Sequence, residues 1–320
     1  LKQDEIDINQ RTIIYAANKN SKIKSYKSVI HIAFEKRYNE LLKVILSNPK
    51  INVNQIAISK YIIKEKINNY INRLNVLNNM INVKKDKEYY KEDTLINMAL
   101  SKGDLEIVKL LLLNQNINPN IKTIVKKENE TDENVALNIA IEKGYWDIAR
   151  ILLSIKEIDV NLKSIINRQV KTALSIAIEK NNMQFVKELI SNSKIDVNQP
   201  IKCSTYITSM HQKCYYHNLD EYDDYMHDDD SDDYYNYNYN NQGPKKVDQE
   251  KNILYIAIEN NDIDLVKLLL ARQDINVNIL TNEKSCMIFG EINRETPLFL
   301  AVKIKNMEII HMLLAHPKID

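Results

Sequence analysis

The chain has 320 residues, of which 44% are hydrophobic, so it can bury a substantial core and is not globally disordered. Lysine and arginine total 44 against 43 acidic residues, and this balance provides no overall field that would hold a nucleic-acid backbone. Only four glycines and six prolines are present, too few for the frequent turns of an all-β fold, so helices are expected to dominate.

No apolar run approaches the roughly 18 residues that a membrane span requires. The three cysteines show no pairing pattern, as expected of a reduced intracellular and most simply cytoplasmic chain. The first residue is Leu1 rather than methionine and the last is Asp320, so we expect the natural termini, with any targeting signal, to be missing. We interpret the abundance of Asn, Ile, Lys and Tyr as the codon bias of an AT-rich genome.

A short tail of the form Ile-Asx-Val-Asn recurs from the start of the chain to its end. Six of these tails follow an alanine by a constant 18 residues, whereas the spacing between successive alanines varies from 37 to 80 residues. This combination is typical of a rigid module joined by variable connections. The alanines are Ala33, Ala99, Ala140, Ala177, Ala257 and Ala301.

Inside each module the apolar residues fall twice at helical spacing, with a polar or glycine-containing turn such as Gly103-Asp104 or Asn181-Asn182 between them. Neither helix is long enough to be stable alone, so neighbouring modules must stack. The sequence therefore predicts an all-α fold, in which one array over 1–320 stacks helix-turn-helix units and carries extended β-hairpin or loop insertions. The helix pairs are expected at about 27–48, 94–115, 135–156, 172–193, 252–273 and 296–317.

The first long insertion covers residues 55–92, where apolar residues at helical spacing predict an amphipathic helix. We favour an extended hairpin containing this helix, and the alternative is a decayed repeat, because the insertion brings the step between alanines to two ordinary repeat lengths. The residues that define the predicted helix are Ile63, Ile67, Ile71, Leu74, Leu77 and Ile81.

The second insertion covers residues 199–250 and contains an acidic, Tyr- and Asn-rich stretch at 219–240. Lacking apolar periodicity, it is interpreted as a solvated low-complexity loop, and the alternative is an acidic aromatic segment that engages a basic partner. No metal site is predicted nearby, because the spacing of the candidate ligands fits no standard zinc pattern. Those candidates are Cys203, His211, Cys214 and His217.

Catalytic motifs are missing from the sequence: there is no Gly-rich phosphate loop, no Gly-x-Ser-x-Gly and no His-Glu-x-x-His. We therefore expect no enzymatic activity, no cofactor and no small-molecule substrate. The single tryptophan, Trp146, opens a second helix and is expected to pack on the surface or between repeats rather than to bind a ligand.

The segment Glu295-Thr296-Pro297-Leu298-Phe299-Leu300-Ala301 resembles the opening Thr-Pro-Leu-His-x-Ala of an ankyrin repeat. Residues 103–112 resemble the second helix of the same repeat, and the Asx-Val-Asn tails are similar to its exit toward a β-hairpin. This resemblance implies that His31, which occupies the histidine position of its repeat, is structural. It also implies a concave surface of first helices and hairpin tips that binds another protein.

In this family the contact positions include the two residues before the glycine that ends the first helix. Carried over, they are Glu35, Lys36, Ser101, Lys102, Glu142, Lys143, Glu179, Lys180, Glu259, Asn260, Lys303 and Ile304. Their mixed sign favours a protein partner over nucleic acid or a membrane. Two alternatives stay open: these positions are merely solvated while the loops make the contacts, or the array is the regulatory or targeting part of a larger enzyme or channel.

Overall fold

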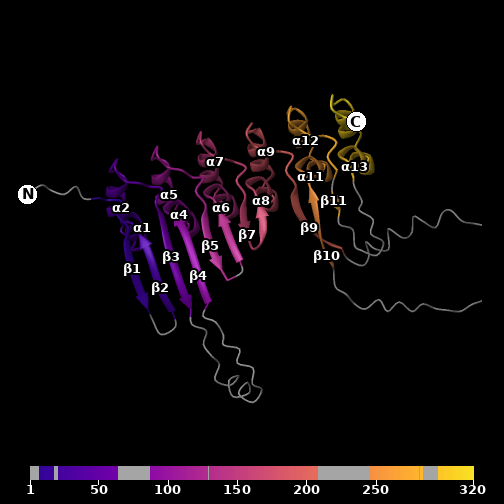
Figure 1. Ribbon diagram of the computed structural model, residues 1–320. Helices are drawn as coiled ribbons and strands as arrows, with labels where there is room; N and C mark the ends of the chain where they lie inside the picture. Colours follow the sequence, from indigo (N-terminus) through magenta and orange to yellow (C-terminus); the bar gives the residue numbers. More distant parts are fainter. Residues whose placement is uncertain are drawn as a thin grey trace, which may run out of the picture. The chain divides into compact units, whose positions relative to one another are not determined.

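The computed structural model describes residues 7–17, 21–63, 87–128, 130–207, 245–280, 282–283 and 295–320. They belong to two compact units, Leu1–Ile195 and Asp196–Asp320, and each unit is treated by itself. In both units short helix pairs alternate with β-hairpins (Figure 1).

Each repeat contains two antiparallel helices of seven to nine residues, too short to be stable without neighbours. In unit 1 the pairs are α1 Val29–Glu35 with α2 Asn39–Leu46, α4 Leu95–Lys102 with α5 Leu105–Leu112, α6 Ala136–Glu142 with α7 Trp146–Ser154, and α8 Ala173–Glu179 with α9 Met183–Ser191. In unit 2 they are α11 Ile253–Glu259 with α12 Ile263–Leu270, and α13 Pro297–Lys303 with α14 Met307–Leu314.

The alanines at the fixed position are almost fully buried, which confirms that this position needs a small side chain where two helices pass closely. Their carbonyls also close the turn, because each accepts a hydrogen bond from the residue that caps the second helix, as from Asp104 to Ala99 at 2.9 Å. The residue before that cap has a positive φ in every repeat. The positive-φ residues are Arg37, Gly103, Gly144, Asn181, Asn261 and Lys305.

Glycine is needed most clearly at position 103. Its φ is +75°, and a Cβ there would lie 2.8 Å from the hydroxyl oxygen of Tyr145 in the next repeat. Neighbouring repeats also meet through aromatic contacts: the Trp146 ring centroid lies 5.2 Å from that of Phe185. The expectation that Trp146 packs between repeats is therefore confirmed.

The asparagine that ends each tail joins its repeat to the next one. Asn54 donates from Nδ2 to the carbonyl of Asn116 at 2.6 Å and accepts the backbone N–H of Asn118 at 2.7 Å. Asn120 makes the same two bonds to Glu157 and Asp159. Within unit 2, Asn198 bonds the backbone of the following tail in the same way. The recurring tail is thus explained by side-chain hydrogen bonds that fix the spacing between repeats.

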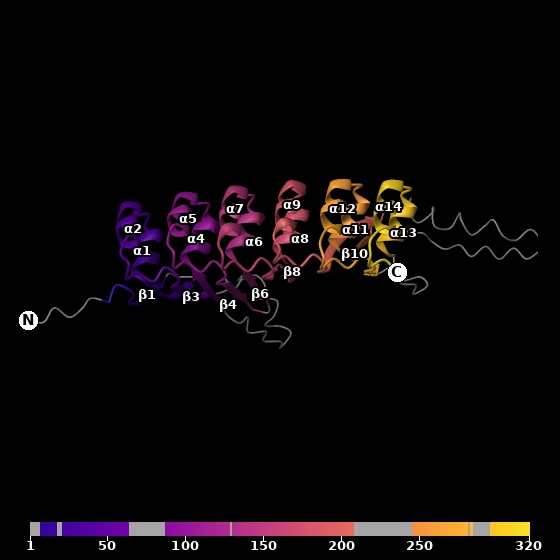
Figure 2. The same ribbon diagram turned by 90° about the horizontal axis from the view of Figure 1, so that it is seen from above.

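The hairpins of unit 1 join into one antiparallel sheet of eight strands in the order β1 to β8, counted over the described residues. Its strands are β1 Thr12–Ala17, β2 Ser21–Lys27, β3 Ile56–Ile63, β4 Lys87–Thr94, β5 Thr123–Lys127, β6 Glu130–Asn134, β7 Ser164–Ile166 and β8 Gln169–Lys171. In unit 2, β10 Lys245–Lys251 pairs with β9 Ile201–Ile207 and β11 Asn282–Glu283. Within unit 1, Figure 2 shows the second helices in one row, the first helices in the next and then the sheet.

The prediction of an all-α fold is therefore wrong, because the sheet is as much part of the structure as the helices. The error came from taking a low glycine count as a sign against strands. Here the β7–β8 hairpin turns through Asn167 and Arg168, with φ of 51° and 64°, and β5 is followed by Glu128 with φ of 46°. Non-glycine residues thus adopt the left-handed turn conformations that glycine usually provides.

The helix predicted from Ile63 onward is wrong at its first residue, because Ile63 ends strand β3 and pairs with Lys87 of β4. The other residues that define that helix lie outside the described residues, as does the acidic stretch 219–240. Strands β3 and β4 occupy the two ends of the first insertion.

The two faces of the eight-stranded sheet differ in burial. Because directly paired residues point to the same side, the strand registers assign each side chain to a face. One, the helix-side face, is directed toward the first helices and includes Ser25, Lys27, Ser59, Asp93, Thr123, Asn134, Ser164 and Lys171. The opposite one, the outer face, includes Ile13, Tyr15, Lys24, Tyr26, Ile58, Lys60, Tyr90, Lys126, Ile165 and Val170, none of which is buried.

Candidate functional site

The residues predicted to contact a partner all lie where a first helix ends. Ser101 is the exposed next-to-last residue of α4, and each of the others is either the last residue of its helix or its C-cap, so the first helices present them at similar places. All are exposed except Glu142, which is half-buried. They are Glu35, Lys36, Ser101, Lys102, Glu142, Lys143, Glu179, Lys180, Glu259, Asn260, Lys303 and Ile304.

The glutamates at these helix ends form ion pairs with the strand that precedes the helix. Glu35 pairs with Lys27 at 2.7 Å and Glu179 with Lys171 at 2.6 Å, both in unit 1. In unit 2, Lys251 pairs with Glu259 at 2.7 Å. Each pair spans eight residues, from the strand end to the helix end, so the glutamate charges are neutralised within their own repeats.

The same spacing persists when the signs are exchanged: Glu295 pairs with Lys303 at 3.0 Å in the last repeat. Glu142 has Asn134 at the corresponding strand position, and among the described residues it forms no ion pair. Sequence reasoning identified the helix-end residues but missed their strand partners. The signal was available, because a lysine stands eight residues before three of the four glutamates.

A row of buried polar side chains lies on the helix-side face, next to the ends of the first helices. Thr123 donates to Asp93 at 2.6 Å, and Lys91 lies 2.7 Å from the other carboxylate oxygen of Asp93. Burial raises the pKa of the Asp93 carboxyl, and Lys91 and Thr123 oppose that rise. Asn97 of α4 donates to Thr123 at 3.0 Å, so helix and sheet are joined through this row.

The following repeat repeats this connection with different residues. Asn138 of α6 donates to Ser164 Oγ at 2.8 Å and to the carbonyl of Leu162 at 3.1 Å, and Ser164 donates to Asn134 at 2.7 Å. His31, at the matching place in α1, is fully buried, and its Nδ1 lies 2.8 Å from Ser28 Oγ. Apart from His31 Nε2, which is buried without a hydrogen-bond partner among the described residues, the polar groups named here are paired within their repeats, so we interpret this part of the surface as structural.

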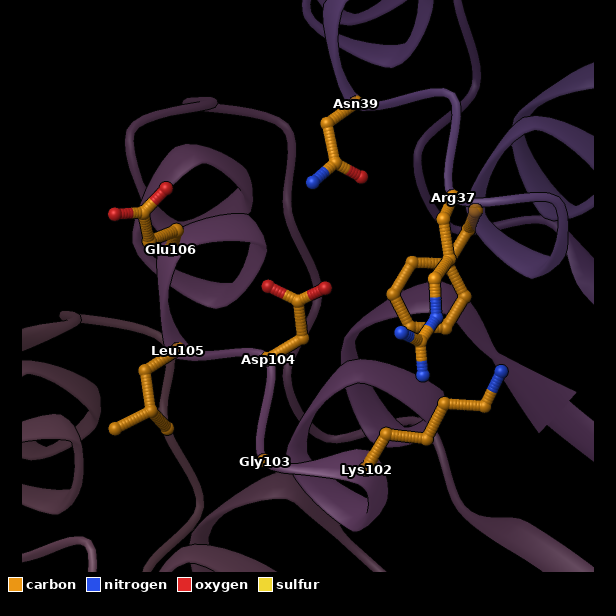
Figure 3. Close-up of a pocket in the computed structure, with 8 residues that line it drawn as sticks. Arg37, Asn39, Lys102, Gly103, Asp104, Leu105 and Glu106 are labelled. Carbon is orange, nitrogen blue, oxygen red and sulfur yellow. The ribbon is translucent and has the colours of Figure 1, made fainter.

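Beside Lys102 lies a hollow of about 510 Å³ between the turns of the first two repeats (Figure 3). The Lys102 ammonium lies 4.6 Å from the centroid of the Phe34 ring, and Arg37 reaches into the same space. Asp104 and Glu106 place carboxylates on the opposite side. The hollow offers charges of both signs around one aromatic ring, which suits a polar side chain of a partner.

Neither a metal site nor a membrane-spanning helix is found within the described ranges. No group of three or more His, Cys, Asp or Glu side chains there comes together to hold a metal ion. None of the helices there has the length and hydropathy that a bilayer requires. Of the four residues considered for zinc, only Cys203, in β9, falls within the described residues.

Comparison with known proteins agrees with this architecture. A family model described as ankyrin repeats (3 copies) matches residues 56–164, 96–201 and 234–320. A search of curated proteins found no significant match. Because the matched segments cover well over half of a chain that stacks helix pairs and hairpins in this way, the protein belongs to the ankyrin-repeat family.

Proposed function

We propose that this protein binds another protein through the surface formed by the ends of its first helices and the adjoining hairpins. Ankyrin repeats are generally protein–protein interaction modules and are typically non-catalytic, which supports a binding role without a cofactor or small-molecule substrate. Within this surface, the residues that contact the partner are the helix-end residues named above.

The observation that carries this proposal is the combination of an exposed lysine and a paired glutamate at the ends of α1 and α8. Since Glu35 and Glu179 are held by strand lysines, the neighbouring Lys36 and Lys180 stay available, and Lys143 is exposed as well. An interface gains most from side chains held in place before binding, because less conformational freedom is then lost. Mixed charge suits a polar protein surface better than nucleic acid or a membrane.

The test uses matched double variants of residues 1–320. Proximity labelling in the source cells nominates partners, and each nominated protein is purified and titrated calorimetrically. Lys143→Glu with Lys180→Glu reverses two helix-end charges, whereas Lys109→Glu with Lys156→Glu reverses two exposed charges on the side of the second helices. We expect the first pair to weaken binding by about tenfold and the second pair to leave it unchanged. Equal effects would contradict the proposal.

A further inference from the structure

The outer face of the eight-stranded sheet carries a row of lysines and tyrosines that crosses five strands. Tyr15 of β1 is paired with Lys24 of β2, Lys24 with Lys60 of β3, Lys60 with Tyr90 of β4, and Tyr90 with Lys126 of β5. Adjacent strands are about 4.8 Å apart, so these side chains form one continuous line. This line, Tyr15-Lys24-Lys60-Tyr90-Lys126, is called the lysine row.

The ammonium groups of the lysine row lie over aromatic rings rather than beside carboxylates. Lys24 is 5.5 Å from the Tyr15 ring centroid, while Lys60 and Lys126 are 5.9 and 5.7 Å from that of Tyr90. Among the described residues none of the three lysines has an ion-pair partner, and the nearby Glu92 accepts the hydroxyl of Tyr90. The row thus presents positive charge that is not ion-paired with any carboxylate in the described part of the chain.

Placing Lys24 directly opposite Lys60 is unfavourable for folding, since like charges at paired positions repel. Such an arrangement costs stability within unit 1, which the tyrosine rings offset in part and which an anionic group bound against the row would offset further. Tyrosine rings beside the lysines add apolar contact area with little loss of rotamer freedom.

A second row on the same face is mainly apolar and crosses all eight strands. Along each of the five strands that the lysine row crosses, the second row lies two residues, or about 7 Å, from it. Its end members Ile13 and Val170 are 49% and 50% exposed, and exposed apolar side chains that gather on one face are typical of an interaction surface. This apolar row is Ile13-Tyr26-Ile58-Glu92-Ile124-Glu133-Ile165-Val170.

We propose that the outer face binds an acidic amphipathic helix of another protein, which lies across the strands. Its carboxylates face the lysine row, and its apolar side chains cover the isoleucines and Val170 of the apolar row, with polar side chains opposite Glu92 and Glu133. Eight strands span about 34 Å, the length of a helix of about 22 residues. This surface is on the opposite side of the sheet from the one described under Proposed function.

The pattern of charges favours such a helix over nucleic acid or an anionic membrane. Lysines 22, 24, 60 and 126 share the outer face with Glu88, Glu92 and Glu133, so its net charge is small. A uniformly anionic surface would be repelled by those glutamates. A helix with separate acidic and apolar stripes meets the lysines without bringing its carboxylates onto Glu92 or Glu133.

The test measures binding of a fluorescent helical peptide of about 22 residues with one Glu stripe and one Leu stripe to residues 1–320. A peptide of the same composition with both stripes scrambled is the control ligand. The outer-face variant is Lys24→Gln/Lys60→Gln/Lys126→Gln, and the matched helix-side variant is Lys36→Gln/Lys143→Gln/Lys180→Gln. Thermal unfolding of each variant, followed by circular dichroism, verifies that it folds as the parent does.

We expect the striped peptide to bind about tenfold more tightly than the scrambled one, and the outer-face variant to lose about tenfold in affinity. The helix-side variant should bind like the parent. The inference is overturned if both peptides bind equally or if the outer-face variant keeps full affinity. It is also overturned if phosphatidylserine vesicles or single-stranded DNA bind more tightly than the striped peptide.

If only the helix-side variant lost peptide binding, the inference about the outer face would be overturned. The proposal that a partner binds the ends of the first helices would not be affected by that result. Conversely, failure of the helix-end charge reversals with a natural partner would not affect the peptide result. The two proposals therefore fail separately.

Discussion

The two faces of the eight-stranded sheet use the same residue types in different ways. On the helix-side face, Lys27 and Lys171 are held by helix-end glutamates, and Asp93, Thr123 and Ser164 are buried in hydrogen-bonded rows. On the outer face Lys24, Lys60 and Lys126 lie over tyrosine rings, and among the described residues of that face only Thr94, at the end of β4, is buried. The ion pairing of a lysine, and not its presence in a strand, therefore decides whether its charge is available to a partner.

The largest expected effect on the free energy of unfolding comes from protonation of His31, which is buried beneath the helix-side face. Burial lowers its pKa from 6.5 to about 4. Because the folded pKa lies below the unfolded one, the unfolded chain binds more protons between these values, and stability falls as the pH drops through this window. We expect the free energy of unfolding to fall by about 3 kcal/mol from pH 7 to pH 4 through this group alone.

Urea unfolding at several pH values measures this loss. The variant His31→Gln lacks the titrating group, so its stability should depend less steeply on pH between 6.5 and 4. Parallel pH profiles for parent and variant would show that His31 is not held neutral by burial.

A smaller loss is expected for Asn138→Ala, which removes the bonds to Leu162 and Ser164 and leaves their oxygens without this donor. Unpaired buried polar groups cost about 1–3 kcal/mol, so the urea midpoint should fall clearly. Thr131→Ala on the outer face is the matched control, since its side chain is exposed, and it should change stability by less than about 0.5 kcal/mol. If Asn138→Ala and Thr131→Ala lowered stability by similar amounts, the claim that the two faces differ would be wrong.

The strand-to-helix ion pairs should matter still less for stability. Lys171 and Glu179 have side chains that are 20% and 41% exposed, and such pairs contribute about 0.2–1 kcal/mol. A double-mutant cycle with Lys171→Met and Glu179→Gln isolates their coupling energy. A coupling above about 2 kcal/mol would mean that the pair is a stability element rather than a means of positioning the helix end.

The smallest effect, opposite in sign, is expected for Lys60→Gln. Removing one of two directly opposed lysines relieves repulsion, so stability should rise by a few tenths of a kcal/mol at low salt. Added salt screens exposed charges, so the gain should shrink as ionic strength increases. A destabilised variant at low salt would indicate that Lys60 has a favourable partner in the fold.

The sequence predicted the repeating parts of the fold because they depend on neighbouring residues. The buried Ala99 and the left-handed turn at Gly103 follow from local spacing, and both are present. The sheet could not be predicted in this way, since the pairing of β2 with β3 joins residues more than thirty positions apart. The outer-face rows were hidden for the same reason: which side chains share a face is known only once the strand register is known.

The most direct test of the contrast between the two faces is the rate at which each lysine reacts with an amine-selective acetylating reagent, followed by mass spectrometry. Lys27 and Lys171 have side chains only 13% and 20% exposed and are bound to carboxylates. Lys60 and Lys126 are exposed and have no acidic partner among the described residues. We predict that Lys60 and Lys126 react several-fold faster than Lys27 and Lys171. Equal rates for the two pairs would contradict the claim that the outer face is open for binding while the helix-side face is structural.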